Sequence, residues 1–430
     1  MLTRRWREAA ALRRRPLAVT TTAAAGRCTC DRRRASTAAA PRLSTNLSCG
    51  LVGLPNVGKS TIFNALTSMS VPAENYPFCT IEPHVGVVEV PDPRLEPLSQ
   101  LAGSKRTVPA AMQFVDIAGL VAGASTGAGM GNAFLQNIRD VDAILHLVRC
   151  FDSPDVVRAD GEVDTIVDPA ADAAVIDTEL LLADLQTVER ALGKLKGKRG
   201  GSDAALGAAL GAALEGLEAG VAVRELEPEH AEHLQQYNLL TAKPMLFLAN
   251  VGLGDEGTRE SNEHVAALHE HSGGAMVSVC AVLEEELGQL EDAEEVSLAM
   301  LQFTSTSPLI VLVIQRREFL GELGLAGEED LALGAVVREA YKLLQLQTFF
   351  TCGPAESRAW RVRRGADASG AASVIHTDIG RNLVKAEVVS YDVLVEAGGW
   401  AEAKALGQLR TEAKDYLVQD GDVCHFLHSG

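Results

Sequence analysis

The segment GLPNVGKST, residues 53–61, constrains this chain more than any other feature of its sequence. It fits the pattern G-x-x-x-x-G-K-[ST], with an apolar run before it and a helical stretch after it, which is the context that a phosphate-binding loop requires. Glycine lets backbone N–H groups turn inward around phosphates, and the N-terminus of the following helix adds a favourable dipole. The segment therefore predicts a nucleoside triphosphate site between a buried strand and a helix.

Side chains in and after this loop predict how the phosphates and a magnesium ion are held. We expect Lys59 to place its ammonium on the β and γ oxygens and Ser60 to offer its hydroxyl to Mg²⁺. A D-x-x-G sequence follows at Asp116 and Gly119, where the carboxylate is expected to hold Mg²⁺ through water and the glycine N–H to sense the γ-phosphate. Thr80, between the two motifs, is the candidate second hydroxyl on Mg²⁺. Lys59, Asp116 and Gly119 are the predicted catalytic groups.

Apolar runs flanked by Gly, Asn or Pro indicate the fold class. They lie at residues 47–54, 112–119, 143–150, 244–250 and 275–280. Each is typical of a buried parallel strand, and stretches with helical spacing separate them. The pattern predicts an α/β fold, a doubly wound and mostly parallel sheet, over residues 45–345.

Two further units are expected around this sheet. Residues 176–240 carry Leu, Ala, Glu and Lys at helical spacing, which predicts an inserted antiparallel helical hairpin, with two crossover helices on the sheet as the alternative. The predicted apolar seam of the hairpin is Leu181, Leu182, Leu185 and Val188. Residues 346–430 switch to short alternating segments, which predict a small mixed β domain with a tight turn at Asp420-Gly421 before its last strand.

The N-terminal 44 residues have a different composition from the rest. Residues 1–42 hold eleven Arg against Glu8 and Asp31, and they are rich in Ala, Ser and Thr, as in an organellar transit peptide. A disordered basic tail is the alternative. We expect location in the plastid stroma or mitochondrial matrix, with the plastid slightly favoured, or in the cytoplasm if the leader is not functional.

The formal net charge of −18 limits the partners of the chain. An acidic body repels the phosphate backbone, so any contact with nucleic acid must come from a local basic patch, and we expect no sequence-specific DNA binding. Two short candidates exist, at residues 194–200 and 361–365, and a solvated face is the more common explanation of each. The longest apolar runs fall short of a membrane span of about 20 residues, so no membrane partner is expected.

Several long motifs carry a resemblance to a known family. These are GLPNVGKST, AENYPFCTIEPHVGVV, DIAGLVAGASTGAGMGNAFLQNIRDVDAI and KDYLVQDGDV. Over about residues 48–428 the chain resembles the Obg-like ATPases of the YchF subfamily. The resemblance implies a P-loop NTPase that prefers ATP to GTP, a hairpin inside the nucleotide domain, a C-terminal TGS domain of β-grasp fold, and a ribosome-binding monomer with the large subunit as the expected partner. It also implies phosphate contacts from Asn56, Val57, Gly58, Lys59, Ser60 and Thr61, and base contacts from Asn250 and Val251.

Two positions leave base choice and hydrolysis open. A guanine-specific site carries Asn-Lys-x-Asp, whereas residues 250–253 read Asn-Val-Gly-Leu, and Leu253 stands where the family resembled has an acidic residue. ATP is therefore favoured mainly by the resemblance. Leu120 stands where Ras-type enzymes carry the Gln that orients water. Hydrolysis should be slow unless the glycine-rich segment 123–131, a cation such as K⁺ near Asn56, or a partner supplies order.

Residues 296–315, VSLAMLQFTSTSPLIVLVIQ, interrupt an acidic amphipathic helix that reads smoothly when they are removed. Val codons begin with GT and one Gln codon ends with AG, so the segment has the borders of an intron. We interpret it as an unspliced intron, with a real apolar insertion as the alternative. Mass spectrometry of the natural protein is expected to find a peptide that joins Glu295 to Arg316, and peptides from within the segment would contradict this interpretation.

These observations predict an ATP-binding switch protein that hydrolyses ATP slowly with Mg²⁺, binds ribosomes, and regulates translation or a stress response in an organelle. One alternative is a nucleotide-gated ribosome-binding scaffold without useful catalysis. A second is a GTPase of ribosome assembly, which the sequence at 251–253 disfavours.

Overall fold

The computed structural model describes residues 47–68, 84–117, 129–152, 167–197, 204–252, 262–273, 276–285 and 332–429, without the side chains of 129–133 and 196–197. The leader, the segment 296–315, Thr80, Gly119, Leu120 and Leu253 lie outside these ranges. Within the described part of the chain, no helix is long and apolar enough to cross a membrane.

The first sheet contains the five predicted strands. They are β1 (Ser48–Val52), β4 (Ala110–Asp116), β5 (Ala143–Arg149), β6 (Met245–Asn250) and β7 (Met276–Val279). The sheet order is β2-β4-β1-β5-β6-β7, and all pairs are parallel except β2 with β4. The unpredicted β2 (Val85–Val90) is an antiparallel edge strand that alternates between half-buried and buried residues. The predicted α/β class and mostly parallel sheet are confirmed.

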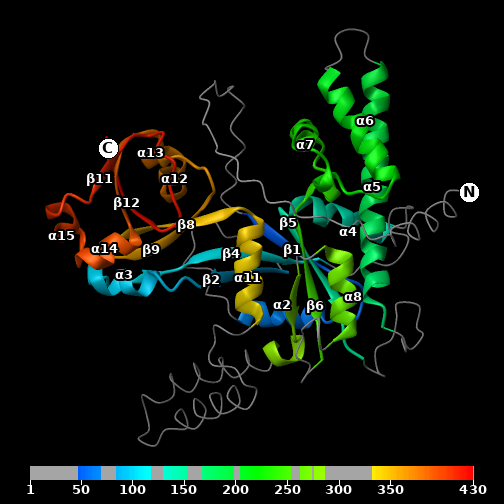
Figure 1. The fold of residues 1–430 in the computed structure, drawn as a ribbon, viewed down its shortest axis with the longest axis horizontal. Helices are drawn as coiled ribbons and strands as arrows, with labels where there is room; N and C mark the ends of the chain where they lie inside the picture. The colour runs from blue at the N-terminus through cyan, green and yellow to red at the C-terminus, as the bar shows by residue number, and fades with distance from the viewer. Residues whose placement is uncertain are drawn as a thin grey trace, which may run out of the picture.

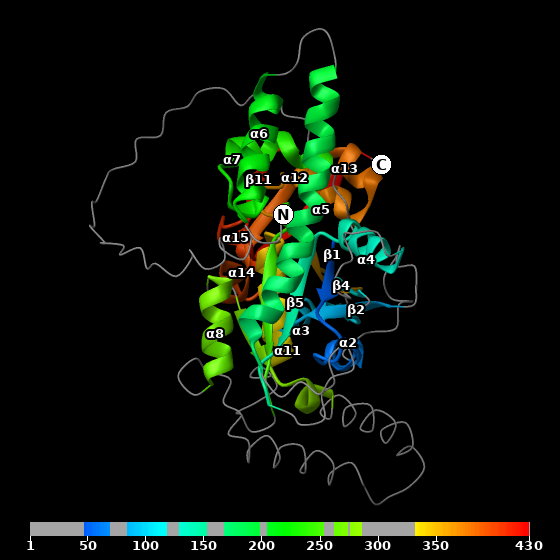
Figure 2. The same cartoon turned by 90° about the vertical axis from the view of Figure 1, so that its right-hand side faces the viewer.

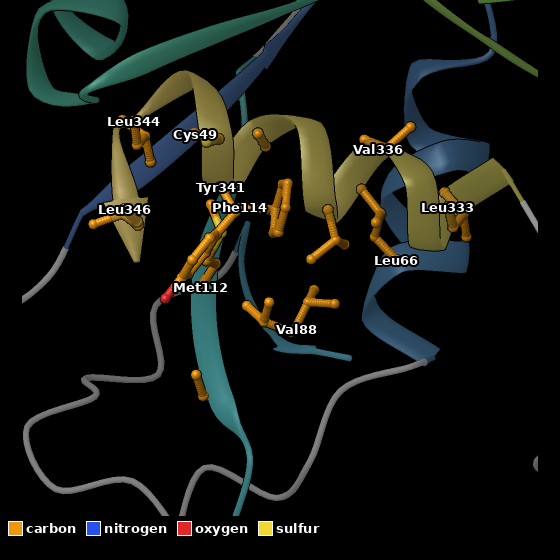
Figure 3. Packing of buried hydrophobic residues seen from close by; sticks show 14 of the residues in the cluster. Cys49, Leu66, Val88, Met112, Phe114, Leu333, Val336, Tyr341, Leu344 and Leu346 are labelled. Atoms are coloured by element: carbon orange, nitrogen blue, oxygen red, sulfur yellow. The ribbon is translucent and has the colours of Figure 1, made fainter. Parts of the chain in front are cut away.

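Helices cover both faces of this sheet because successive strand residues point to opposite sides. On β5, Leu145 and Leu147 pack into one cluster, whereas Ile144 and Val148 pack into the other. The first cluster includes residues of α2 (Lys59–Ser68) and α11 (Ala332–Leu343), and Figure 3 shows α11 lying over Met112, Phe114 and Val88. The second includes residues of α4 (Gly129–Asp140), α5 (Pro169–Gly197) and α8 (Glu263–Ser272).

The helix α5 both covers the sheet and forms a hairpin. Its first part packs on the strands, and its second part packs against α6 (Ala204–Glu218) and α7 (Pro228–Leu234) in a separate apolar cluster. α5 and α6 stand out beyond the sheet (Figures 1 and 2). Of the predicted seam, Leu181 and Val188 are buried and Leu185 packs against them, while Leu182 is half-buried and lies outside that cluster.

The C-terminal residues build a second sheet of order β11-β10-β12-β8-β9-β3. Its strands are β8 (Leu346–Cys352), β9 (Ser357–Arg363), β10 (Leu383–Ser390), β11 (Arg410–Glu412) and β12 (Asp422–His428). Helices α12 (Ala368–Ile375), α13 (Thr377–Arg381), α14 (Tyr391–Ala397) and α15 (Trp400–Ala405) accompany them. The predicted turn is present, since Gly421 has a φ of +85° and β12 follows it directly. That this unit is a TGS domain stays a prediction.

The sixth strand of that sheet comes from the nucleotide-binding part. β3 (Thr107–Val108) pairs in parallel with the start of β9, and Ser357 N donates to Arg106 O at 2.9 Å. The preceding Ser104 donates its hydroxyl to Gly353 O at 2.7 Å. Because β3 lies in the connection between β2 and β4, the C-terminal sheet is attached to the connection between two strands of the first sheet.

Arg94 bonds the connection between β2 and β4 to the predicted turn at Asp420-Gly421. It lies just before α3 (Leu95–Ala102), where its guanidinium donates to both carboxylate oxygens of Asp92, at 2.9 and 2.7 Å, and to Asp420 Oδ2 at 2.8 Å. It also lies 5.2 Å from the ring centre of Phe350. Asp420 in turn accepts a hydrogen bond from Thr348 N at 2.9 Å. One cation therefore holds α3, β8 and the last turn together.

Replacing Arg94 with alanine is expected to lower the free energy of unfolding by about 1–2 kcal/mol, because it removes two charge-assisted contacts and one ring contact. Urea denaturation of the full chain measures this change. Arg381→Ala, at an exposed arginine of the C-terminal part, is the control and should change stability by less than about 0.5 kcal/mol. Equal effects of the two changes would contradict the role of Arg94.

The Arg94 effect should also depend on pH. Burial is the largest single effect and raises the pKa of Asp420, but the hydrogen bonds from Arg94 and from Thr348 N, together with the charge of Arg94, lower it by more, so that the pKa lies below its ordinary value. A carboxylate with a lowered pKa stabilises the fold above its unfolded-state pKa of about 4 and loses this contribution as pH falls through the folded-state pKa. The difference between wild type and Arg94→Ala is therefore expected to be full at neutral pH and smaller in acid.

Candidate nucleotide site

The phosphate-binding loop is shaped by two residues with positive φ. β1 ends at Val52, and the chain turns through Asn56 (φ +62°) and Gly58 (φ +92°) before α2 begins at Lys59. A Cβ on Gly53 would lie 2.7 Å from Leu147 O, so the loop also needs glycine at its start. Positive φ values of this kind are typical of loops that turn successive N–H groups toward a bound anion, and this loop leads into the N-terminus of α2.

Asn250 holds this loop from the neighbouring strand end. It ends β6 and is only 3% exposed. Its Nδ2 donates to Val57 O at 2.8 Å, and its Oδ1 accepts from Ala281 N at 3.0 Å. One side-chain amide therefore joins the phosphate-binding loop, the end of β6 and the segment after β7.

The charged groups of the site meet at the ends of β1 and β4. Asp116 ends β4, opposite Leu51 of β1, and its N–H donates to His84 O at 2.9 Å. Lys59 Nζ lies 3.5 Å from Asp116 Oδ1, with the two side chains 12% and 15% exposed. The structure therefore brings these two predicted catalytic residues together at the mouth of the loop.

The donor set suits Mg²⁺. Asp116 Oδ1 is buried and accepts no hydrogen bond from the described residues, and Ser60, in the first turn of α2, is exposed. A carboxylate oxygen and a hydroxyl are hard ligands of the kind that Mg²⁺ takes in sites that also use substrate phosphates. Thr80, the predicted second hydroxyl, lies outside the described residues.

The remaining predicted residues differ in exposure, and some of them lie outside the described residues. Asn56 is exposed on the loop, and Thr61 is half-buried in the first turn of α2. Val251 is buried, with its N–H donating to Val279 O at 2.9 Å, so that only its carbonyl remains for a base. Gly119 and Leu253 lie outside the described residues. Which of these groups contact nucleotide stays a prediction.

One contributor was not predicted, and one buried histidine lies on the strand next to the start of the loop. Ala281 takes part through its backbone N–H, for which a side-chain motif gives no signal. His146, on β5, is 1% exposed and packs against Phe247 with ring centres 5.0 Å apart. Burial lowers the pKa of His146 to about 4, so the imidazole is neutral at physiological pH. In this conformation its packing is that of a core side chain.

Gly58→Ala is expected to weaken nucleotide binding at least a hundredfold. The positive φ disfavours any side chain there, and the new Cβ would collide with Asn250 Nδ2 and displace the hydrogen bond to Val57 O. Calorimetric titration with a non-hydrolysable ATP analogue and Mg²⁺ measures the affinity.

Gly193→Ala is the matched control, because no atom lies within 4 Å of its Cβ position on α5. It should leave nucleotide affinity unchanged and raise stability by about 0.5–1 kcal/mol. Affinity of Gly58→Ala within twofold of wild type would show that the loop does not need this conformation.

Comparisons with known proteins agree with this geometry. Residues 48–178 match a family model described as 50S ribosome-binding GTPase, and residues 346–429 match the model of the YchF GTPase C-terminal domain, described as a protein of unknown function. The ribosome-binding ATPase YchF of Haemophilus ducreyi is 46% identical over 387 residues, covering 88% of this chain and 98% of the relative. That of Bacillus subtilis is 41% identical over 388 residues, with the same coverage.

A solved structure shows the same arrangement. The Schizosaccharomyces pombe YchF GTPase matches with a TM-score of 0.72 and 33% identity, covering 89% of this chain and 98% of the other. The match spans both sheets, and the sequence identities are well above the level at which only a fold is shared. Relatives more than 40% identical cover 88% of the chain, and it therefore belongs to the YchF family of P-loop nucleoside triphosphatases.

Proposed function

We propose that this protein is a Mg²⁺-dependent ATPase that binds ribosomes, hydrolyses ATP slowly and changes conformation with its nucleotide state. The observation that carries the proposal is the buried amide of Asn250 holding the phosphate-binding loop beside Lys59 and Asp116. The names of the relatives, ribosome-binding ATPases, support ATP and the ribosome as ligands. ATP in preference to GTP, the large ribosomal subunit, a monomeric state and a K⁺ ion near Asn56 are further parts of the proposal.

The chain's own groups perform binding and orientation. Backbone N–H groups from Val57 to Thr61 would bind the phosphates at the N-terminus of α2, and Lys59 would exchange its contact with Asp116 for the β and γ oxygens. Ser60 and Asp116 would hold Mg²⁺, which supplies charge neutralisation at the phosphates when bound.

A chain of hydrogen bonds leads from α4 to the hairpin. The predicted γ-phosphate sensor Gly119 precedes α4 in the sequence. At the other end of α4, Arg139 O accepts hydrogen bonds from Lys243 Nζ and Asn238 Nδ2, both at 3.0 Å, and Arg139 donates back to Asn238 O at 3.1 Å. A movement of α4 would therefore pull on the segment around Asn238.

That segment is bonded directly to α5. Asp184, fully buried on α5, accepts hydrogen bonds from Leu240 N at 2.9 Å and from Thr241 N and Oγ1, both at 2.7 Å. We propose that nucleotide-dependent ordering after Gly119 reaches the hairpin through α4 and this buried carboxylate. The hairpin would then present a different surface to the ribosome in each nucleotide state.

Single-turnover hydrolysis of radiolabelled ATP, with and without ribosomes from the same compartment, tests the activity. We expect a slow basal rate that ribosomes stimulate, and no hydrolysis by Lys59→Ala, which removes the ammonium from the phosphates. A wild-type rate that ribosomes do not change would instead favour the nucleotide-gated scaffold.

Competition titration with ATP and GTP on the leader-free chain tests base choice. Tighter ATP binding is expected, and tighter GTP binding would favour a GTPase. We also propose that residues 1–44 direct the protein to the plastid or mitochondrion. A fluorescent protein fused to these residues reports the compartment, and a cytoplasmic signal would contradict this part of the proposal.

A further inference from the structure

The hairpin carries a groove remote from the nucleotide site. It lies between α5, α6 and the short helix η4 (Gln235–Tyr237), with a volume of about 360 Å³. Its lining residues are Thr187, Arg190, Ala191, Lys194, Leu195, Leu206, Gln236 and Tyr237. The volume is at the lower end of the range for small-ligand pockets, about 300–1,000 Å³.

The groove has an apolar floor and a cationic rim. Ala191 is buried, and Leu195, Leu206 and Tyr237 pack as half-buried side chains on the apolar cluster of the hairpin. Ala191 and Leu195 lie one turn apart on α5, so they face the groove together. An aromatic ring and aliphatic side chains therefore form a surface against which a flat, apolar group can pack.

The rim concentrates positive charge on an otherwise acidic chain. Arg190 and Lys194 both line the groove, and no carboxylate occurs in the sequence from residue 190 to residue 202, whereas the whole chain has a formal charge of −18. Arg190 Nε donates to Gln186 O at 2.9 Å, which ties its guanidinium to α5. No ion pair joins Arg190 or Lys194 to a carboxylate of the described residues.

In the other basic run, residues 361–365, Arg361 is already used within the fold, whereas Arg363 and Arg364 are exposed. Arg361 donates to Ala111 O, and the guanidinium of Arg358 lies over the Trp360 ring at 4.4 Å and 3.7 Å from Glu356. These arginines hold the C-terminal sheet to the first sheet and to itself. The hairpin groove is the stronger candidate for binding an external ligand, because there the cations stand beside an apolar floor and an aromatic ring.

The combination of groups points to one class of ligand. Two cations suit a phosphodiester, and an aromatic ring on an apolar floor suits a stacked base. The Gln236 amide donates through Nε2 to His233 O at 3.4 Å, and its Oε1 can accept a hydrogen bond from a base edge. An acidic peptide would use the cations but would leave the tyrosine face and the leucines without a partner. We propose that this groove binds a single-stranded RNA segment, with its phosphates at Arg190 and Lys194 and one base stacked on Tyr237.

This inference rests on the proposed ribosome binding and deepens it, because it assigns RNA, rather than a ribosomal protein, to the hairpin. A groove of this size accommodates one nucleotide and not a duplex, which limits the target to an unpaired loop or end. Affinity for such a segment should fall with salt, because each phosphate contact releases counterions.

Fluorescence anisotropy with the full chain and a fluorescein-labelled, mixed-sequence RNA of twelve nucleotides tests the proposal. Arg190→Glu combined with Lys194→Glu should weaken binding at least tenfold and flatten the salt dependence. Arg381→Glu combined with Lys385→Glu makes the same charge change at two exposed residues of the C-terminal part and should leave affinity within about twofold. Equal losses in the two double variants would overturn the assignment.

Variants of Tyr237 separate stacking from a structural role. Tyr237→Phe keeps the ring and should bind like wild type, whereas Tyr237→Leu keeps an apolar contact and should bind about tenfold more weakly. Unchanged ATP affinity in every variant confirms folding. Wild-type RNA affinity in Tyr237→Leu would contradict a stacked base.

Sedimentation with ribosomes separates this inference from the proposed function. If the wild-type chain does not sediment with ribosomes, the proposed function fails. If it does, and the Arg190/Lys194 double variant loses ribosomes while still binding the RNA, the hairpin recognises a ribosomal protein and the RNA assignment is overturned. Parallel loss of RNA and ribosome binding in that variant supports the assignment.

Discussion

The nucleotide site depends on the side-chain amide of Asn250. A phosphate-binding loop turns its N–H groups toward the ligand, so its carbonyls must find partners on the other side. Asn250 accepts and donates at once, bonding Val57 O with its nitrogen and Ala281 N with its oxygen. A carboxylate could not donate to the Val57 carbonyl, and an apolar side chain could do neither. The positive φ values of Asn56 and Gly58 are therefore maintained by a contact made outside the loop.

The parallel strands of the first sheet place the other groups of the site beside this loop. The strand ends that carry Leu51, Asp116 and Asn250 meet because β1, β4, β5 and β6 are parallel and adjacent. Two elements beside this sheet make contacts with other parts of the chain: α4, which follows β4, contacts the hairpin through Arg139, and the connection after β2 contacts the C-terminal sheet through Arg94. The first contact joins α4 to the hairpin, and the second joins α3 to the C-terminal sheet.

Much of this could be predicted from the sequence, because its strongest signals are side-chain patterns. Continuous apolar runs marked all five parallel strands, and the Asp420-Gly421 pair marked the last turn. β2 was not predicted, since an antiparallel edge strand has one face half-exposed and so lacks a continuous apolar run. β3 was not predicted because two residues are too few to show a period, and its partner β9 is about 250 residues away.

At the nucleotide site too, residues that act through side chains could be predicted, and a residue that acts through its backbone could not. Lys59, Asp116 and Asn250 act through side chains at recognisable spacings, and the structure brings them to one edge of the sheet. Ala281 contributes a backbone N–H, which any residue possesses, so no residue type could identify it. The sequence also could not show that Arg361 is bonded within the fold whereas Arg190 and Lys194 line a groove. All three occur in short basic runs, and only the fold shows what each side chain contacts.

The shared sheet has a consequence for how the chain is divided. The first apolar cluster contains Leu95 and Leu98 of α3 together with Phe350, Val389 and Val423 of the C-terminal strands. A fragment that stopped before β8 would leave β3 as an unpaired edge and turn α3 and one side of α11 out to water, where such surfaces promote aggregation. The nucleotide-binding part should therefore not fold as an independent fragment. Its apolar core is complete only when the C-terminal strands, β12 included, have been synthesised.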